Sequence, residues 1–445
     1  MDLTKGDLGT LIRKIAVPSS IGFFFNTLFN IIDNFYIGYI GVEALAGLSL
    51  SFPVFFILIS IGSGIGMGVS ALISNLIGER DYEKGFYLAM DSITLSFIVG
   101  IIITILGLKY DETFFKFMGA EGSVLLYGVN YTKWIFLGSI FFVINMILNG
   151  ILVAQGNTKT YRNFLIVGVL INIILDPFFI FVLGMTTDGV AIATVLIQIV
   201  GNIYLYLKVK DSMLICKRSY KLKKPNIKNI IGILEQGIPS SFSMMTIALG
   251  IFVINFYVNQ EGGEKAIAAY GIAMRIEQLV LLPAIGLNSA ALSIAGQNFG
   301  AKNLERVKDT YFKTLKYGLI IMTSGMVVIL PLVPYLYSIF TKDVDVLKYG
   351  MGYFRVEIFV FNSYVILNIA EAVLRGLKYP KFSIFVGIYR QFLMPILCFP
   401  ISIKIFNGIT GIWIGILGIN WTAAIIMSLY LLYAYKKEKI KKEIV

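Results

Sequence analysis

Long apolar segments recur along the whole chain, and short polar connectors separate them. Each segment is longer than the roughly 18 residues that a helix needs to cross the hydrocarbon core of a membrane. The pattern therefore predicts twelve membrane-spanning helices. Six are expected in the first half of the chain, at residues 10–38, 44–77, 86–108, 123–153, 161–184 and 187–208. Six are expected in the second half, at residues 228–259, 266–298, 311–339, 347–374, 382–405 and 409–435.

Basic residues gather in every second connector. Loops rich in Lys and Arg remain in the cytoplasm, whereas loops on the other side of a membrane are poor in them. The alternation predicts an even number of spans and two cytoplasmic termini, in a multi-pass protein of the inner or plasma membrane of the cell. Seven connectors hold 28 of the 38 Lys and Arg residues: 5–14, 80–84, 159–162, 208–228, 302–316, 375–381 and 436–442.

The two halves of the chain resemble each other. Residues 17–20 (Val-Pro-Ser-Ser) correspond to residues 238–241 (Ile-Pro-Ser-Ser), a displacement of 221 residues. The same displacement carries the Asn-Phe-Tyr of residues 34–36 onto residues 255–257. Chance similarity between apolar helices accounts for shared Leu and Ile, but not for these matches. Because six spans is an even number, both copies have the same orientation in the membrane.

The predicted fold is an all-α polytopic membrane protein with two parallel six-helix bundles related by pseudo-two-fold symmetry. We expect the N-terminal bundle at residues 1–210 and the C-terminal bundle at residues 228–445. A cytoplasmic linker is expected at residues 211–227, where the sequence is rich in Lys. Repeats of this kind place their binding sites near the middle of the membrane.

Composition supports a membrane protein and excludes several kinds of site. Hydrophobic residues make up 57% of the chain and charged residues 14%, against about 25% charged residues in soluble domains. The chain contains no histidine, so His metal ligands, Ser/His or Cys/His nucleophile pairs and His proton relays are ruled out. The net charge of +12 lies in the connectors. We therefore expect no nucleic-acid partner, no cofactor and no enzyme activity.

Two carboxylates lie deep inside predicted spans. Asn30 precedes Asp33 by about one helical turn, and Asn172 precedes Asp176 by one turn, so each carboxylate shares a helical face with an amide. A charge at the centre of a membrane costs about 2.5–3.5 kcal/mol on insertion scales. Each carboxylate therefore needs a compensating role.

The second repeat has no counterpart of either carboxylate. Asp33 corresponds to Ile254, and Asp176 corresponds to Met394 or Ile396, depending on where a gap is placed. A role in packing would allow the same residue in both copies, so we interpret the pair as an ion or proton site of the first bundle. Two neutral carboxyl groups that only connect helices are the alternative interpretation.

Two carboxylates in a pocket of low dielectric cannot both stay ionised without a cation. The pair therefore shares a proton or binds a hard cation such as sodium through oxygen ligands. The oxygen ligands on offer are those of Asp33, Asn172, Asp176 and Thr194. The sequence does not choose between proton and sodium, and it predicts no other metal site.

The second half has charged residues inside two of its spans. Arg275 and Glu277 lie in the eighth span, and Arg355 and Glu357 lie in the tenth. Residues two apart point to different sides of a helix, so we predict that an Arg of one span pairs with a Glu of the other. Contact with substrate is the alternative role for these residues.

Other residues are candidates for movement and for substrate contact. Pro18 removes a backbone hydrogen bond from the first span, on the same helix as Asp33, and we expect a hinge there. Methionine side chains are flexible and accommodate varied ligands, although packing is their alternative role. The candidates for a substrate cavity are Asn30, Asn149, Met244, Met274 and Arg275.

Five stretches, in this order and spacing, are typical of one family. They are residues 32–38 (Ile-Asp-Asn-Phe-Tyr-Ile-Gly), 154–157 (Ala-Gln-Gly-Asn), 172–177 (Asn-Ile-Ile-Leu-Asp-Pro), 189–194 (Gly-Val-Ala-Ile-Ala-Thr) and 374–376 (Leu-Arg-Gly). Together they make nearly the whole chain resemble the multidrug and toxic compound extrusion transporters. The resemblance implies secondary active multidrug efflux, by antiport of a drug against a proton or sodium ion. We expect small amphipathic, cationic substrates and a monomer in the lipid bilayer.

The resemblance is closest to the branch whose cation-linked site lies in the N-terminal bundle. The aromatic residue one turn before the first aspartate is often Tyr in that family and is Phe29 here. The sodium-coupled branch carries acids in its seventh and tenth spans, whereas here the tenth span has Tyr364 in the corresponding region. A C-terminal cation site of that kind is not expected. The N-terminal pattern maps onto Asp33, Asn149, Asn172, Asp176 and Thr194.

A flippase for lipid-linked or amphipathic precursors is the main alternative function. Arg275 and Arg355 are the features that would suit a pyrophosphate, whereas the acidic pair of the first bundle disfavours this function. An intramembrane enzyme is disfavoured because no metal-ligand cluster and no nucleophile–base pair is present. A channel is disfavoured because the sequence has no filter-like segment.

Overall fold

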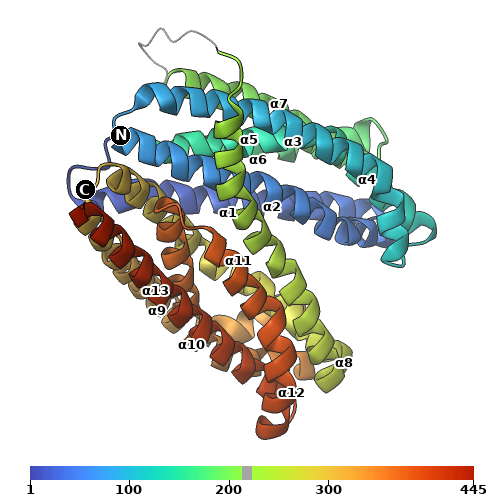
Figure 1. Cartoon of the computed structure of the whole chain (residues 1–445). Helices are drawn as coiled ribbons and strands as arrows, with labels where there is room; N and C mark the ends of the chain where they lie inside the picture. Colours follow the sequence, from blue (N-terminus) through green and yellow to red (C-terminus); the bar gives the residue numbers. More distant parts are fainter. Residues whose placement is uncertain (213–222, 445) are drawn as a thin grey trace. The chain divides into compact units, whose positions relative to one another are not determined.

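A computed structural model of the protein describes residues 1–212 and 223–444, and nearly all of these residues are helical (Figure 1). The helices of the first half are α1 (Leu8–Ile40), α2 (Val42–Gly78), α3 (Tyr82–Phe117), α4 (Gly122–Leu137), α5 (Ser139–Ala154), α6 (Lys159–Pro177), the π-helix η1 (Phe178–Val182) and α7 (Thr187–Lys210). Those of the second half are α8 (Ile227–Gly300), α9 (Leu304–Phe340), α10 (Val344–Gly376), α11 (Lys381–Ile388), the π-helix η2 (Tyr389–Leu393), α12 (Met394–Phe406) and α13 (Ile409–Ile444).

The described residues contain enough apolar helix for the predicted twelve spans. Ten helical segments are long and apolar enough to cross a membrane, and α4 with α5, bent by 53°, forms an eleventh. Helix α8 has 74 residues, which at 1.5 Å per residue is more than three times the thickness of a hydrocarbon core. Its backbone leaves the helical conformation at Gly263 (φ 63°, ψ −160°), so it comprises two spans. The predicted number of spans is confirmed.

The chain folds into two compact units. The first unit comprises residues 1–2 and 21–241, and the second comprises residues 3–20 and 242–445. The first half of α1 therefore packs in the second unit, and the beginning of α8 packs in the first. These bounds differ from the bundles expected at 1–210 and 228–445, because the exchanged half-helices find their packing partners outside their own repeat. Of the linker expected at 211–227, residues 213–222 lie outside the described residues.

The two half-helices that pack in the other unit end at corresponding places of the internal repeat. One division falls after Ser20 and the other after Ser241, 221 residues later and at the same place in the repeated Pro-Ser-Ser motif. Within the second unit, Ser20 donates a hydrogen bond to the Pro283 carbonyl (3.5 Å), and within the first unit Ser241 donates to the Ile61 carbonyl (3.2 Å). Glycines permit this close approach between helices. Gly286 faces Ser20 and Gly64 faces Ser241, with no room for a side chain at either glycine.

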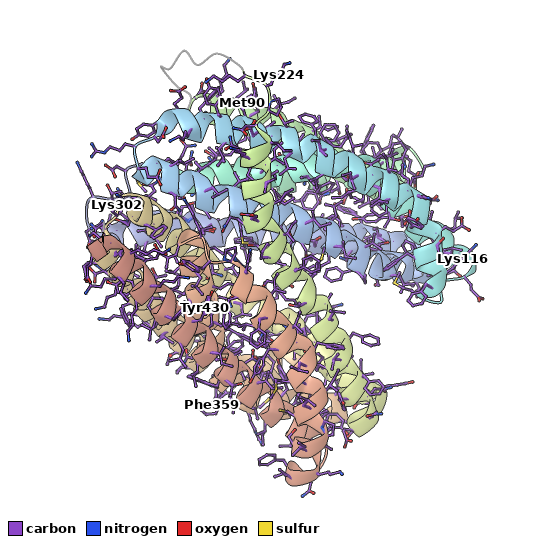
Figure 2. All side chains as sticks on the ribbon, viewed as in Figure 1. Met90, Lys116, Lys224, Lys302, Phe359 and Tyr430 are labelled. Atoms are coloured by element: carbon purple, nitrogen blue, oxygen red, sulfur yellow. The ribbon has the colours of Figure 1, made fainter. Side chains whose placement is uncertain are left out.

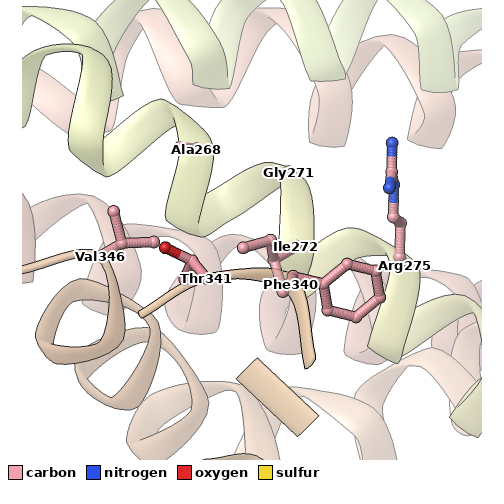
Figure 3. A pocket seen from close by; sticks show the side chains of 7 residues that line it. All are labelled: Ala268, Gly271, Ile272, Arg275, Phe340, Thr341 and Val346. Carbon is pink, nitrogen blue, oxygen red and sulfur yellow. The ribbon is translucent and has the colours of Figure 1, made fainter. Parts of the chain in front are cut away.

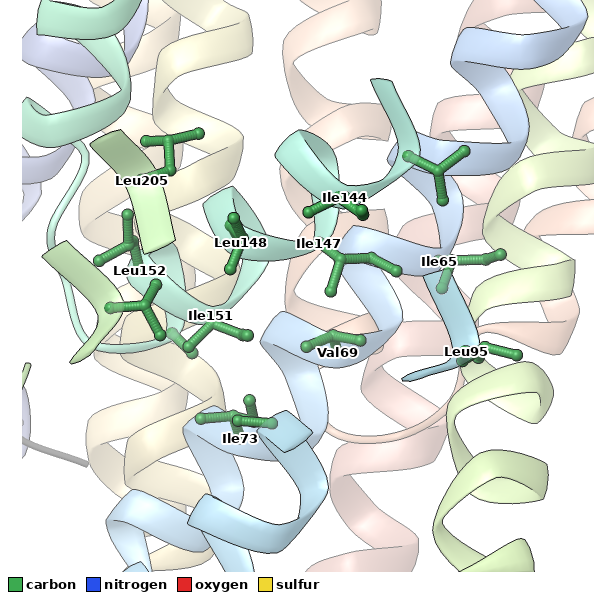
Figure 4. Close-up of a cluster of buried hydrophobic side chains, with 14 of the residues drawn as sticks. Ile65, Val69, Ile73, Leu95, Ile144, Ile147, Leu148, Ile151, Leu152 and Leu205 are labelled. Atoms are coloured by element: carbon green, nitrogen blue, oxygen red, sulfur yellow. The ribbon is translucent and has the colours of Figure 1, made fainter. Parts of the chain in front are cut away.

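The core of the first unit is built on apolar residues at helical spacing. Ile65, Val69 and Ile73 line one face of α2, and Ile147 and Ile151 line the facing side of α5 (Figure 4). All five side chains are fully or almost fully buried. Residues three or four apart lie on the same side of a helix, so these stripes hold α2 and α5 together.

The outer surfaces of the helices are also apolar. Phe252 on α8 is 73% exposed and Phe359 on α10 is 60% exposed, whereas charged residues such as Lys116 and Lys302 lie at helix ends (Figure 2). Soluble proteins do not expose apolar side chains on this scale, because water solvates them poorly. The protein is therefore a multi-pass membrane protein whose exposed helix surfaces contact lipid.

Replacing Asp81 by alanine is expected to lower the free energy of unfolding by about 1 kcal/mol, because Asp81 caps the first turn of α3. Its carboxylate accepts a hydrogen bond from the Lys84 amide (3.1 Å) and pairs with the Lys84 ammonium (2.6 Å). D81N is the matched control, since Asn303 caps the start of α9 in the same way, by accepting a hydrogen bond from the Arg306 amide. Unfolding in mixed micelles measures both variants, and equal losses would contradict the capping role.

The contribution of Asp81 to the free energy of unfolding also depends on pH. Hydrogen bonds from the side chain and the backbone of Lys84 hold the pKa of the Asp81 carboxyl below its usual value. The stabilisation is therefore complete above the unfolded-state pKa of about 3.9, and it is lost as the pH falls through the lower pKa of the folded protein. The difference in the free energy of unfolding between wild type and D81A should therefore disappear as the pH falls through the pKa of the folded protein.

Candidate functional site

Asp33 of α1 and Asp176 of α6 lie together in the first unit. Their side chains are 4% and 0% exposed. The Asn172 amide nitrogen donates to Oδ1 of Asp33 (3.0 Å) and to Oδ1 of Asp176 (2.9 Å). The two carboxyl groups also lie within hydrogen-bonding reach of each other. The three side chains therefore form one buried cluster, which we call the aspartate cluster.

The local backbone places Asp176 at an irregular point of its helix. Asp176 is followed by Pro177, which has no amide hydrogen to donate, and the π-helix η1 begins at Phe178. A π-turn is wider than an α-turn and is frequent at functional sites. One turn before Asp176, Asn172 points to the same side of α6 and reaches α1.

Two further oxygen groups lie in the same unit. Thr194 of α7 is buried, and its hydroxyl donates to the Val190 carbonyl (3.0 Å), which leaves its lone pairs available. Tyr131 of α4 is buried in the neighbourhood of Asp33 and Asp176. Sequence reasoning did not identify Tyr131, because a Tyr within an apolar helix usually indicates packing.

The aspartate cluster contains buried oxygen atoms without partners. Within the described part of the chain, Oδ2 of Asp176 and Oδ1 of Asn172 accept no hydrogen bond. An unsatisfied polar atom in a membrane costs free energy, and these atoms are acceptors only. A proton on a carboxylate or a small hard cation would satisfy them. The side chains present therefore fit either ion.

Asn30 and Asn149, the residues of the first unit predicted to line a substrate cavity, lie outside the aspartate cluster. Asn30 is exposed, and its side chain donates to the Asn26 carbonyl (2.9 Å), while Asn34 donates to the Asn30 carbonyl (2.6 Å). Three amides thus follow one exposed side of α1. Asn149 is half-buried on α5, and none of the hydrogen bonds found in the described residues joins it to Asp33 or Asp176.

Arg275, which was also predicted to line a substrate cavity, lines a cavity in the second unit. The cavity has a volume of about 470 Å³, and Figure 3 shows the side chains around it. Met244 and Met274 are half-buried and do not line this cavity. The lining residues are Ala268, Gly271, Ile272, Arg275, Phe340, Thr341 and Val346.

The predicted ion pairs between the eighth and tenth spans are wrong. Arg275 and Arg355 are exposed, Glu277 and Glu357 are buried, and no ion pair joins any two of them in the described part of the chain. The offset of two residues turns each Arg outward and each Glu inward. Glu277 instead accepts a hydrogen bond from the Tyr353 hydroxyl (2.8 Å).

Helix α10 holds a buried ion pair of a different kind. Arg375 donates to Oε1 of Glu371 one turn earlier, and the Ser243 hydroxyl of α8 donates to the same oxygen (2.9 Å). Burying these charges is tolerated because they are paired and hydrogen-bonded. The pair lies within the second unit.

Pro18 lies close to the point where α1 passes between the units. The division falls between Ser20 and Ile21, two residues beyond the proline, while α1 remains helical from Leu8 to Ile40. Ser19 is tied to Ser289 of the second unit by a hydroxyl–hydroxyl hydrogen bond (3.0 Å). The backbone is therefore weakened by one hydrogen bond immediately before the division.

Comparison with known proteins gives consistent matches over most of the chain. The sequence profile of the MatE family matches residues 18–178 and 239–400, together well over half of the chain, and the two matches begin 221 residues apart. The chain is 27% identical to the multidrug export protein MepA of Staphylococcus aureus (strain MSSA476) over 347 residues, 77% of this chain and 76% of that protein. It is 26% identical to the FAD transporter of Shewanella oneidensis over 399 residues, 88% of this chain and 87% of that protein.

The fold also matches a solved structure. That structure is described as the outward-facing conformation of a multidrug resistance MATE family transporter. The two structures superpose with a TM-score of 0.92 and 29% sequence identity, over 98% of each chain. Repeat, spans and fold agree, and the chain belongs to the MatE family of membrane transporters, which are not enzymes.

Proposed function

We propose that the protein exports drugs by secondary active antiport against a proton or a sodium ion. The observation that carries the proposal is the aspartate cluster, in which Asp33 and Asp176 are buried together and bridged by Asn172. Multidrug export is also the activity named for the Staphylococcus aureus relative, and the superposed structure is described as a multidrug resistance transporter. Small amphipathic cations are the substrate class that we propose.

The aspartate cluster would take up the coupling ion. The carboxylates of Asp33 and Asp176, which both accept from the Asn172 amide, lie close enough to repel each other. The cluster therefore binds a proton or a cation in place of a second negative charge. Thr194 supplies a further hydroxyl if the ion is sodium. An inward membrane potential contributes about 2.3 kcal/mol per charge per 100 mV, which can drive export against a gradient.

Helix α1 would connect ion binding at the aspartate cluster to a change in its own shape. Asp33 lies on the part of α1 in the first unit, whereas Pro18 lies on the part in the second unit. We propose that α1 bends near Pro18 when the ion binds, in alternating access with both termini in the cytoplasm. The residues proposed to contact substrate are Asn30, Asn149, Met244, Met274 and Arg275.

The test is ethidium efflux from proteoliposomes that hold the purified protein, with a pH gradient or a sodium gradient imposed alone. We expect one gradient to drive ethidium against its concentration gradient and the other to have no effect, because one ion occupies the aspartate cluster. An ionophore that collapses the effective gradient should abolish transport. If neither gradient drives ethidium or any other amphipathic cation, the antiport proposal is wrong.

A further inference from the structure

Four aromatic side chains gather on the outer surface of the second unit. Phe382 of α11 stacks on Tyr430 of α13, with ring centres 3.8 Å apart and ring planes 11° from parallel. Phe385 lies 5.6 Å from Phe382, and Tyr433 lies 5.9 Å from Tyr430, again between ring centres. Phe385 is 53% exposed and Tyr433 is 57% exposed. The four rings therefore form one patch that the protein leaves partly uncovered, and we call it the ring patch.

The ring patch lies at one boundary of the membrane. Helix α13 has 36 residues, which at 1.5 Å per residue is about 54 Å, whereas the hydrocarbon core is about 30 Å thick. Counted from Ile409, the roughly 20 residues that cross the core end close to Leu429, which is 59% exposed. Tyr430 and Tyr433 thus lie where hydrocarbon gives way to lipid headgroups. This is the level of the membrane at which aromatic side chains concentrate.

Lysines continue the same face of α13 beyond the rings. Tyr430, Tyr433, Lys437 and Lys441 follow one another at intervals of three, four and four residues, so they share one side of the helix. Lys437 comes seven residues after Tyr430, a rise of about 10 Å along the helix axis. Its ammonium group therefore lies at the level of the lipid headgroups, while the rings lie at the level of the upper acyl chains.

The loop before α11 brings further lysines to the same place. Nζ of Lys437 lies 5.8 Å from the centre of the Tyr379 ring, and the Tyr379 hydroxyl donates to Oε1 of Glu438 on α13 (2.5 Å). Tyr379 therefore holds this loop against α13. Its neighbours in the sequence, Lys378 and Lys381, are both exposed.

Three lysines around Tyr379 have no acidic partner. Glu438 is already paired with Lys441 (2.7 Å). Among the residues that the structure describes, Lys378, Lys381 and Lys437 make no ion pair. We call these three residues the lysine group. Uncompensated positive charge beside a membrane surface attracts the phosphate groups of anionic lipids.

We propose that the ring patch and the lysine group together bind one anionic phospholipid. The lysines pair with its phosphate, and the rings pack against its glycerol and the beginning of its acyl chains. The order of rings and then ammonium groups along α13 matches the order of acyl chain and phosphate in a lipid. A soluble acidic molecule would use the lysines alone, so a lipid is the ligand that uses both groups.

The site lies outside the aspartate cluster and adds a binding site to the proposed antiport function. In the orientation proposed above, with the C-terminus in the cytoplasm, the bound lipid belongs to the cytoplasmic leaflet. The lipid would hold the loop before α11 and the end of α13 at a fixed depth in the membrane. Binding of the lipid is measured without transport, so failure of the antiport proposal leaves this site testable.

Native mass spectrometry of the purified protein with equimolar phosphatidylglycerol and phosphatidylcholine tests the lipid site. We expect one phosphatidylglycerol to remain bound under conditions that remove phosphatidylcholine. The double variant K378Q/K437Q should bind phosphatidylglycerol more weakly, by about fivefold for each lysine removed. K342Q/K348Q is the matched control, because it removes two exposed lysines beside the beginning of α10, at the other end of that helix from Tyr379. Equal retention of the two lipids by the wild type, which needs no variant, would overturn the proposal, and so would equal losses in the two double variants.

The contribution of the rings is measured with F382A. This variant removes the ring that stacks on Tyr430 and leaves the charge unchanged, so phosphatidylglycerol binding should weaken by roughly two- to tenfold. F359A is its control, since Phe359 is an exposed ring of the same unit outside the patch, and it should bind as the wild type does. An excess of water-soluble glycerol phosphate should not displace the lipid. Displacement by glycerol phosphate, or unchanged binding in folded F382A, would show that the lysines bind phosphate without the rings and would contradict the lipid site.

Discussion

Replacing Asp33 or Asp176 by asparagine is expected to abolish gradient-driven efflux and to leave the protein folded. An asparagine oxygen can still accept the hydrogen bond from Asn172, whereas the amide cannot take up a proton or neutralise a cation. Coupling free energies of 1–3 kcal/mol correspond to roughly 5–150-fold effects, so driven ethidium accumulation should fall at least about fivefold. The measurement is accumulation in proteoliposomes under the effective gradient, with folding followed by gel filtration.

Asp111 provides the matched control for these variants. It is a buried acid of the same unit, and its two carboxylate oxygens accept hydrogen bonds from the Thr132 hydroxyl (2.8 and 2.9 Å). D111N removes a buried charge without touching the aspartate cluster, so efflux should persist. Normal efflux in both D33N and D176N, with unchanged dependence on the proton and sodium gradients, would show that the coupling site lies elsewhere.

The spans and the repeat could be predicted because local composition determines them. A helix in lipid must be predominantly apolar, so the segments ending near Ile40 and Gly78 are visible as long apolar runs. The bend between α4 and α5 at Gly138 could not be predicted. It arises where Gly138 lies against the Val195 side chain, and such a tertiary contact leaves no periodic signal.

The exchange of half-helices could not be predicted for the same reason. Hydropathy reports how apolar a segment is, so it does not say which helices residues 3–20 and 227–241 contact. The positions of the two half-helices depend on close contacts, of Ser20 with Gly286 and of Ser241 with Gly64. The repeated Pro-Ser-Ser motif was visible in the sequence, but its packing partner was not.

The aspartate cluster was accessible from sequence because its members are rare in spans. Asp33 and Asp176 each stood out as a carboxylate within an apolar run, and Asn172 lay one turn from the second of them. Tyr131 and the partners of Glu277 were not accessible. Tyrosine is common in spans for its apolar body, so only its position in space shows that its hydroxyl faces a carboxylate.

Replacing Gly64 by alanine is expected to destabilise the first unit although alanine is the better helix former. The exchange of glycine for alanine within a helix contributes up to about 1 kcal/mol in favour of the variant. A Cβ atom at position 64 would lie 2.5 Å from Cα of Ser241 and would overlap its amide nitrogen and hydroxyl. Carbon atoms in contact are normally about 3.5–4.0 Å apart, so the start of α8 would have to move away from α2.

That movement would also break the hydrogen bond from Ser241 to the Ile61 carbonyl, which is one of the contacts holding the exchanged half-helix in place. Overpacking of this kind costs about 1–3 kcal/mol beyond the gain in helix propensity, so G64A should unfold at a lower concentration of denaturant in mixed micelles. G232A is the matched control, because Gly232 lies on the same exchanged half-helix and a Cβ atom there meets no atom within 4 Å. It should match or exceed the wild type in stability. A G64A variant as stable as G232A would mean that α8 does not pack against Gly64 as the structure describes.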